Sequence, residues 1–175
     1  MSAPRIWLAD FDEAETVAAL LVEFRDWTGK DWPSDNAFLA SVERLIEDRR
    51  ATEFLLGSPH DDAPPAGVCQ LRYRFSVWTA AEDCWLEDLY VRDDDRRSGL
   101  GRALVEASFR RARERECRRI ELDVSEANAP ARGRDRRGGG ARRDRRARLH
   151  RRGLGPPLRG QGHRPRLRRW QRRRG

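Results

Sequence analysis

The sequence lacks the features of a secreted, membrane-spanning or metal-binding protein. No apolar run approaches the roughly 20 residues that a membrane-spanning helix needs. The amino terminus does not join a cationic start to an apolar stretch, as a secretory signal does. Neither the cysteines nor the histidines have metal-site spacing; they are Cys69, Cys84, Cys117, His60, His150 and His163. We therefore expect a cytoplasmic protein with reduced thiols, no bound metal and no membrane partner.

Charge divides the 175 residues into two unlike parts. The net charge is +8, but residues 132–175 contain nineteen Arg and two Asp, which leaves −9 for residues 1–131. The acidic part is long enough to bury a hydrophobic core. Residues 132–175 have almost no apolar periodicity, so they cannot pack a core. We predict a domain over residues 1–131 and a disordered Arg/Gly-rich tail over residues 132–175.

Apolar spacing predicts an α/β domain with a mixed sheet and flanking helices. Strands are expected at 5–9, 53–56, 67–78, 85–91 and 120–124, and helices after Asp12, Asp35 and Gly99. Asp12 and Glu15 predict a capping box, and Gly29 should end the first helix. Trp27 and Trp32 are expected to pack in the core, with a substrate wall as the alternative. A helix joins the last two strands, so these strands should be parallel.

The stretch from Trp85 to Arg102 joins a strand to a long helix through a bend with two glycines, Gly99 and Gly101. Glycine lets backbone N–H groups approach a ligand without an intervening Cβ. The first turn of a helix has N–H groups without internal partners, and its dipole favours an anion. A plain strand-to-helix connection explains the glycines equally well. The third glycine of a dinucleotide fingerprint and the Gly-Lys-Ser/Thr of a P-loop are absent, so we expect a different pyrophosphate ligand.

Arg96-x-x-Gly99-x-Gly101, directly after Leu89-Tyr90-Val91, resembles the acetyl-CoA signature of the GNAT (general N-acetyltransferase) superfamily. This resemblance implies a central mixed sheet with flanking helices, acetyl-CoA as co-substrate and, in many members, a homodimer. Asn128 resembles a cofactor-contacting residue of the family's next motif. By this likeness the cofactor-binding residues are Leu89, Tyr90, Val91, Arg96, Arg97, Ser98, Gly99, Leu100, Gly101, Arg102 and Asn128.

Glu87 and Asp88 resemble the acidic position that serves the amine in the diamine and polyamine acetyltransferase branch. Such an acid would take a proton from the acceptor ammonium. Adjacent strand residues point to opposite faces, so only one should face the site, Glu87 before Asp88. Surface or salt-bridged acids are the alternative. The expected activity is acetyl transfer from acetyl-CoA to a primary amine of a small molecule or polyamine, and an acidic domain suits a cationic substrate.

After Ala131 the sequence departs from the family pattern. The family's next helix carries a Tyr placed to protonate the departing CoA thiolate, and no Tyr follows Tyr90. The family's last helix and two strands also have no counterpart, which would expose a sheet edge. A reading-frame slip is one hypothesis, because CGN arginine codons read one base later encode Gly, Ala, Val or Asp. The alternative function is a degenerate transferase whose basic tail binds nucleic acid through phosphate charge, although Trp170 is the tail's only aromatic residue.

Overall fold

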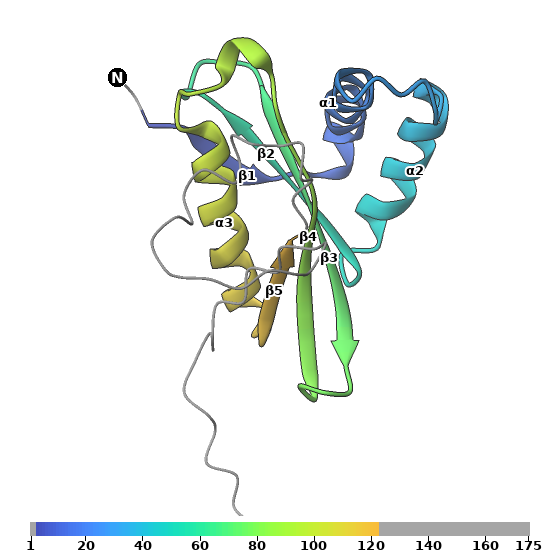
Figure 1. The fold of residues 1–175 in the computed structure, drawn as a ribbon, viewed down its shortest axis with the longest axis vertical. Coiled ribbons are helices and arrows are strands. Elements are labelled where there is room, and N and C mark those ends of the chain that lie inside the picture. Colours follow the sequence, from blue (N-terminus) through green and yellow to red (C-terminus); the bar gives the residue numbers. More distant parts are fainter. Residues whose placement is uncertain (1–2, 123–175) are drawn as a thin grey trace, which may run out of the picture.

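The computed structural model describes residues 3–122, which form a five-stranded sheet with helices on both faces (Figure 1). The elements in chain order are β1 (Arg5–Leu8), the 3₁₀ helix η1 (Phe11–Glu13), α1 (Ala14–Trp27), α2 (Asp35–Glu47), β2 (Thr52–Ser58), β3 (Gly67–Ser76), β4 (Ala81–Val91), the 3₁₀ helix η2 (Asp93–Asp95), α3 (Leu100–Glu114) and β5 (Arg119–Leu122). The strand order is β1-β2-β3-β4-β5. The first four strands are antiparallel and β5 is parallel to β4, so the predicted mixed sheet and its crossover are confirmed.

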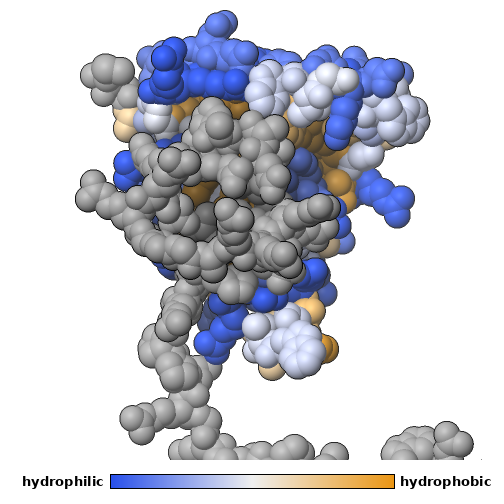
Figure 2. All heavy atoms as spheres, viewed as in Figure 1, coloured by the Kyte–Doolittle hydropathy of each residue, from blue (hydrophilic) through white to orange (hydrophobic). Residues whose placement is uncertain are grey.

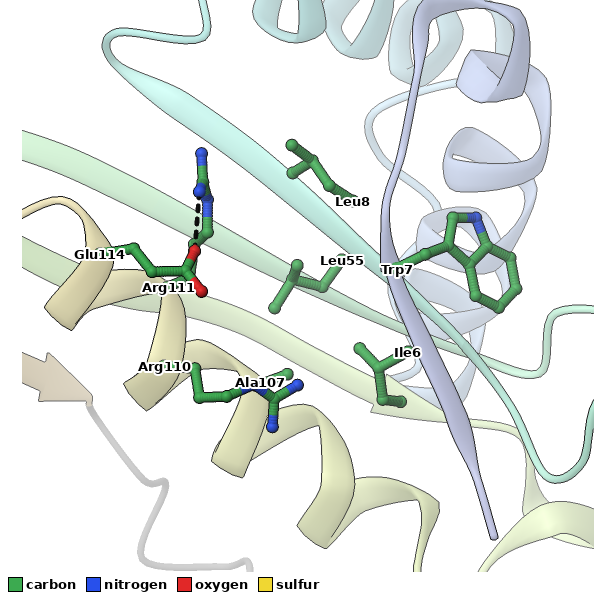
Figure 3. A pocket seen from close by; sticks show the side chains of 8 residues that line it. All are labelled: Ile6, Trp7, Leu8, Leu55, Ala107, Arg110, Arg111 and Glu114. Carbon is green, nitrogen blue, oxygen red and sulfur yellow. Dashed lines mark hydrogen bonds and ion pairs between the residues drawn. The ribbon is translucent and has the colours of Figure 1, made fainter. Parts of the chain in front are cut away.

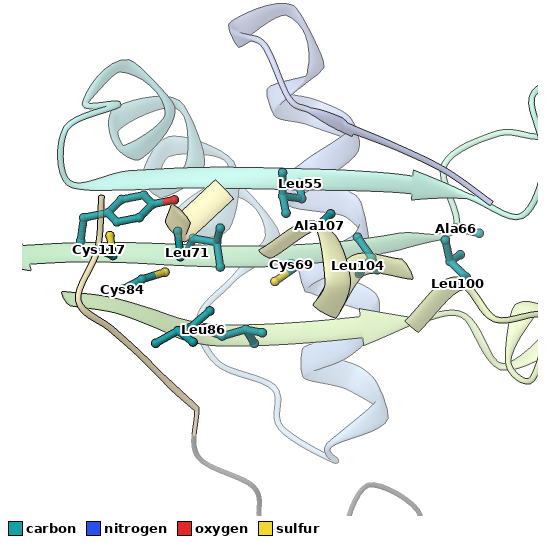
Figure 4. Packing of buried hydrophobic residues seen from close by; sticks show 13 residues of the cluster. Leu55, Ala66, Cys69, Leu71, Cys84, Leu86, Leu100, Leu104, Ala107 and Cys117 are labelled. Carbon is teal, nitrogen blue, oxygen red and sulfur yellow. The ribbon is translucent and has the colours of Figure 1, made fainter. Parts of the chain in front are cut away.

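Side chains of the sheet alternate between two hydrophobic clusters, one on each face. Leu71 and Leu86 pack with Leu104 on the face covered by α3, here called the α3 face (Figure 4). Val68 and Tyr90 pack on the opposite face, covered by α1 and α2 and here called the α1/α2 face. The buried residues of the three α-helices include Val17, Leu20, Leu21, Val42, Ile46, Leu100, Leu104 and Ala107.

The start of α1 differs from the prediction because a 3₁₀ turn precedes the helix. The capping box is formed by Asp10 and Glu13, not by Asp12 and Glu15. The carboxylate of Glu13 accepts a hydrogen bond of 3.0 Å from the backbone N–H of Asp10. The 3₁₀ turn places the cap two residues earlier than helical spacing alone indicates.

The N-cap of α2 is Ser34, whose hydroxyl oxygen accepts a hydrogen bond of 3.4 Å from the backbone N–H of Ala37. Asp35, which the sequence favoured as the cap, is the first helical residue. Serine and aspartate are about equally good N-caps, so composition alone does not choose between neighbours.

The end of α1 is confirmed at Gly29, which has a φ of +74°. The next backbone N–H, of Lys30, donates to the carbonyl of Arg25 at 3.2 Å, a bond typical of a helix that stops at a left-handed glycine. The adjoining tryptophans do not pack in the core as expected, since Trp27 is 51% exposed and Trp32 is 72% exposed.

The expected strands at 67–78 and 85–91 are confirmed as β3 and β4, which form an antiparallel hairpin that projects beyond the rest of the described sheet (Figure 1). The strand β4 is longer than predicted, because it begins at Ala81 rather than at Trp85. Three apolar side chains at the tip are largely exposed: Phe75, Val77 and Trp78.

Among the helices of residues 3–122, none has both the length and the apolarity to cross a bilayer. The predicted tail, residues 132–175, lies outside the described residues.

Candidate functional site

A β-bulge in β4 changes which face each acidic residue occupies. In the ladder between β3 and β4, Asp88 lies opposite Gln70, while Leu86 lies opposite Leu71. Glu87 is therefore an extra residue without an opposite partner. Because side chains alternate along a strand, one extra residue reverses the faces of all residues beyond it.

Packing on either side of the bulge shows this reversal. Leu86 packs on the α3 face, and so does Leu89, three residues later instead of two or four. Tyr90 packs on the α1/α2 face, where its ring lies 5.5 Å from that of Phe24. Asp88 alternates with Leu89 and hence shares the α1/α2 face with Tyr90.

Glu87 also lies on the α1/α2 face. Its carboxylate pairs with Arg72 of β3 at 3.4 Å, and both side chains are nearly half exposed. Arg72 lies between Leu71 and Tyr73, which pack on the α3 face, so its own side chain belongs to the other face. The expectation that only one of the two acids faces the site is wrong, because the bulge brings both Glu87 and Asp88 to one face.

Asp88 and Gln70 are polar residues on this face without partners among the described residues. Gln70 is 5% exposed and Asp88 is half-buried. Within residues 3–122 neither side chain makes a hydrogen bond or ion pair. Burial, together with the neighbouring charge of Glu87, raises the pKa of Asp88, and the ammonium of Lys30 acts in the opposite direction. An unpaired carboxyl with a raised pKa is suited to exchange a proton with a ligand.

Sequence reasoning missed Gln70 as a site residue. Its place opposite Asp88 depends on the bulge, and the residue types in the two strands do not predict a bulge. The available signal is weak: Gln70 is an amide within the otherwise apolar run Val68–Leu71, all of it buried. Among the described residues, its amide atoms are not fully buried and lack a hydrogen-bond partner, so a ligand or water can bond to them.

The predicted glycine bend, Arg96–Gly101, presents free backbone N–H groups at the start of α3. Arg97 has a φ of +66° and Gly99 a φ of +93°. Left-handed residues of this kind turn successive N–H groups toward one side and form a concave anion site. The N–H groups of Gly99, Gly101 and Arg102 donate no hydrogen bond to any residue of 3–122. Together with the helix dipole, they fit a pyrophosphate.

The side chain of Arg96 braces this bend. Its guanidinium donates to the carbonyl of Val91 at 3.0 Å and pairs with Asp93 at 2.7 Å. The same group lies over the ring of Trp27, 4.8 Å from its centroid. Arg97 is exposed and has no ion pair with another residue of 3–122, so its guanidinium is the one available to an anion.

The other predicted cofactor residues offer mainly backbone atoms. Leu100 is 1% exposed, since its side chain belongs to the core. The hydroxyl of Ser98 donates to a carbonyl of η2 at 2.6 Å, and Arg102 pairs with Glu106 at 2.8 Å. Asn128 lies outside the described residues. The upper end of the molecule, where the chain passes from β4 to α3, is hydrophilic (Figure 2).

The end of β4 has backbone groups available along one edge. Within residues 3–122, β4 pairs with β5 only as far as Leu86 and Leu122, although β4 continues to Val91. Residues 87–91 therefore have a described strand partner on the β3 side alone. An extended ligand can hydrogen-bond to such an edge, as an added strand does.

The family is decided by comparison with known proteins. The model of the acetyltransferase (GNAT) family matches residues 17–134. The chain belongs to this family. GNAT acetyltransferases use acetyl-CoA, and the anion site at the glycine bend of this GNAT chain is suited to its pyrophosphate. No curated protein matches the chain.

Solved structures with this GNAT fold cover most of the chain. A candidate acetyltransferase from Arthrobacter sp. FB24 is 30% identical, has a TM-score of 0.65, and aligns over 76% of this chain and 81% of its own. A second candidate acetyltransferase is 24% identical, with a TM-score of 0.67 and coverage of 74% and 84%. The aminoglycoside N-acetyltransferase AAC(6′)-Iy, in complex with CoA, is 20% identical, with a TM-score of 0.62 and coverage of 76% and 84%.

A separate hollow of about 190 Å³ lies between β1 and α3 of the GNAT domain (Figure 3). Its lining residues are Ile6, Trp7, Leu8, Leu55, Ala107, Arg110, Arg111 and Glu114. Arg111 is bound to Glu114 at 2.9 Å and to Glu53 at 2.7 Å, so its charge is already paired. The hollow opens on the α3 face and contains none of the predicted site residues, which lie elsewhere in the domain.

Glu53 anchors a buried polar cluster next to this hollow. Its carboxylate accepts hydrogen bonds from Tyr73 at 2.8 Å and from Arg111 at 2.7 Å, and pairs with Arg115 at 3.2 Å. Burial alone would raise the pKa of Glu53, but hydrogen bonds from Arg111 and Tyr73 outweigh it and hold the pKa below its usual value. A carboxylate with this many partners ties β2, β3 and α3 together, which is a structural role.

Proposed function

We propose that this GNAT chain is an N-acetyltransferase that moves the acetyl group of acetyl-CoA to a primary amine of a small molecule or polyamine. The observation that carries this proposal is the half-buried carboxyl of Asp88, which has no hydrogen-bond or ion-pair partner within residues 3–122. It lies three residues before the end of β4, the strand that leads directly into the glycine bend. A proton acceptor and an anion site are thus joined by one short stretch of chain.

The glycine bend holds the pyrophosphate of acetyl-CoA in this proposal. The N–H groups of Gly99, Gly101 and Arg102 donate to it, and the exposed guanidinium of Arg97 adds a positive charge. The pantetheine arm runs along the open edge of residues 87–90, which have no strand partner on the β5 side within the described residues, while the carbonyl of Val91 is bound by Arg96. This path leads the thioester toward the bulge.

The acceptor amine binds at Asp88 and Gln70. Asp88 attracts the ammonium and takes its proton, while the side-chain amide of Gln70, directly opposite, accepts a hydrogen bond from the amine. Asp88 is favoured over Glu87 as the base, because the carboxylate of Glu87 is more exposed and is already paired with Arg72. Glu87 adds negative charge that draws a cationic acceptor toward the site.

The transfer step then balances without another reactant. The ammonium gives a proton to Asp88, and the neutral nitrogen attacks the thioester carbonyl carbon. A C–N bond forms, the nitrogen releases its second proton to solvent, the C–S bond breaks, and the thiolate leaves and takes up a proton from solvent. The products are the acetylated amine and CoA, and Asp88 releases its proton to solvent before the next cycle.

The proposal is tested by incubating the full chain with acetyl-CoA and a panel of amines while measuring released thiol. The panel contains a diamine, a polyamine, an aminoglycoside, a peptide with a free amino terminus, and an uncharged alcohol as the negative control. We expect release that depends on an amine and fails with the alcohol. A folded sample that binds CoA and releases no thiol with any amine would refute the proposal.

A further inference from the structure

The chain has a single lysine. Of its 37 lysine and arginine residues, only Lys30 is a lysine. A lysine side chain ends in a primary amine, the group that the proposed reaction acetylates, whereas a guanidinium stays protonated and is a poor nucleophile. The position of Lys30 therefore decides whether the protein carries an acceptor of its own.

The end of α1 brings Lys30 toward the candidate site. The ring of Phe24 stacks on that of Tyr90 at 5.5 Å, and Trp27 lies beneath the guanidinium of Arg96. These two contacts place the last turn of α1 over the end of β4, on the face that carries Asp88. Lys30 follows this turn directly.

The backbone of Lys30 is fixed while its side chain is free. Its N–H donates to the carbonyl of Arg25 at 3.2 Å, within the turn that Gly29 creates. The side chain is exposed and makes no hydrogen bond or ion pair with another residue of 3–122. The positive charge of Lys30 lowers the pKa of Asp88, which agrees with the placement of the end of α1 given by the ring contacts. A primary amine and a proton acceptor, neither with a hydrogen-bonded partner, thus share one region of the surface.

We propose that Lys30 is a self-acetylation site, modified within the same molecule by acetyl-CoA bound at the glycine bend. This inference depends on the proposed acetyltransferase function. Asp88 takes a proton from the Lys30 ammonium, and the neutral Nζ attacks the thioester carbonyl carbon. The C–N bond of the amide forms, Nζ releases its second proton to solvent, the C–S bond breaks, and CoA leaves as the thiol after taking a proton from solvent.

Acetylation of Lys30 changes how the site treats external amines. An unmodified Lys30 is a cation that competes with a cationic acceptor for the charge of Asp88. The acetylated side chain is neutral, so Asp88 and Glu87 attract the acceptor without competition. The modification therefore prepares the site for external amines and is completed once per molecule.

The test uses the full chain with acetyl-CoA and no added amine, followed by intact mass measurement and peptide fragmentation. We expect one added acetyl group, located on Lys30, with a rate constant independent of protein concentration. Lys30→Arg should show no addition. Asp88→Asn should slow the addition by at least about tenfold. Modification confined to the α-amino group, or a rate that rises with protein concentration, would overturn the proposal.

Parallel measurements separate this inference from the function on which it rests. Calorimetry with CoA and thiol release with the amine panel are run on the same sample. If CoA binds and external amines are acetylated while Lys30 stays unmodified, self-acetylation is refuted and the acetyltransferase proposal stands. If the folded sample does not bind CoA, both fall together.

A readout without acetyl-CoA tests the proximity itself. The titration of Asp88 is followed by NMR in the wild type, in Lys30→Arg and in Lys30→Gln, which removes the charge as acetylation does. We expect the pKa of Asp88 to rise in Lys30→Gln and to stay near the wild-type value in Lys30→Arg. An unchanged Asp88 pKa in Lys30→Gln would contradict the placement.

Discussion

Asp88 and Gln70 lie directly opposite each other across the β3–β4 ladder, and neither side chain has a partner within residues 3–122. A bulge at Glu87 creates this pair, since it turns Asp88 from the α3 face to the α1/α2 face. The two polar groups therefore meet on a face otherwise packed by apolar residues of α1 and α2. A ligand amine would satisfy both groups at once.

Replacing Asp88 by Asn should remove the proton acceptor and keep the shape. We expect kcat to fall by about 10²-fold, with the dissociation constant for CoA unchanged, because the glycine bend is untouched. Glu87→Gln is the matched control, and its kcat should stay within about threefold of the wild type, since Glu87 is exposed and paired with Arg72. Steady-state kinetics and calorimetry decide the matter; a larger loss in Glu87→Gln would make Glu87 the base.

Gln70→Leu should affect acceptor binding more than chemistry. The leucine keeps the volume and removes the amide, so the acceptor loses one hydrogen bond to its ammonium, worth about 1.5–3 kcal/mol. We expect the acceptor KM to rise about tenfold or more, with kcat and the acetyl-CoA KM little changed. Stability should stay level, because the amide makes no hydrogen bond within residues 3–122 and its polar atoms are not fully buried. An unchanged acceptor KM would remove Gln70 from the site.

Gly99→Ala and Gly101→Ala should separate backbone strain from ligand contact. Gly99 has a φ of +93°, so an alanine there costs about 1 kcal/mol and distorts the bend. A Cβ on Gly101 would meet only Val91, at an ordinary 3.7 Å, and alanine favours the helix by about 0.5–1 kcal/mol. We expect Gly99→Ala to lower both stability and CoA affinity, and Gly101→Ala to raise stability yet lower CoA affinity. Chemical denaturation and calorimetry measure the two effects, and unchanged CoA affinity in both variants would contradict the site.

Glu53 should make the free energy of unfolding depend on pH in the acid range. Its pKa is lowered in the folded state, so its stabilising contribution is present above the unfolded pKa and is lost as pH falls through the folded pKa. Glu53→Gln should lower the free energy of unfolding by about 3 kcal/mol at pH 7, and the difference from wild type should shrink below about pH 4. Glu114→Gln, at a side chain 58% exposed, should change stability by less than about 0.5 kcal/mol. A pH-independent difference for Glu53→Gln would show that its packing matters rather than its charge.

The pH profile of acetyl transfer should report Asp88 and respond to Lys30. The base works only when deprotonated, so kcat/KM should fall as pH drops below the raised pKa of Asp88. The Lys30 ammonium opposes that rise, but self-acetylation neutralises Lys30 of the wild type during the assay. Lys30→Gln should therefore share the wild-type acid limb, whereas Lys30→Arg, which keeps the charge, should have its acid limb at lower pH. An acid limb that ignores the charge at position 30 would assign the titration to another group.

Much of the fold follows from periodicity in the sequence. Apolar spacing located the helices α1, α2 and α3, and the predicted end of α1 at Gly29 is confirmed by the left-handed φ of that residue. The parallel pairing of β4 and β5 followed from the helix between them. Helix starts were less predictable, because η1 and Ser34 depend on one or two residues of local geometry.

The site was predictable only in part. The glycine bend was located from its residues, and its free N–H groups lie where a strand feeds a helix. The faces of Glu87 and Asp88 could not be predicted, because one bulge reverses the alternation. Trp27 and Trp32 were assigned to the core on composition, which says nothing of the loop that exposes them. The reading-frame hypothesis for residues 132–175 stays a prediction, tested by resequencing for a restored Leu-Tyr motif after Ala131.

Calorimetric titration of CoA into the folded full chain tests the central claim most directly. The claim is that free N–H groups at the start of α3 hold a pyrophosphate next to the carboxyl of Asp88. We predict saturable binding of one CoA per chain, weakened in Gly99→Ala and unchanged in Asp88→Asn. Absence of saturable binding by a folded sample, or equal binding by Gly99→Ala, would contradict it.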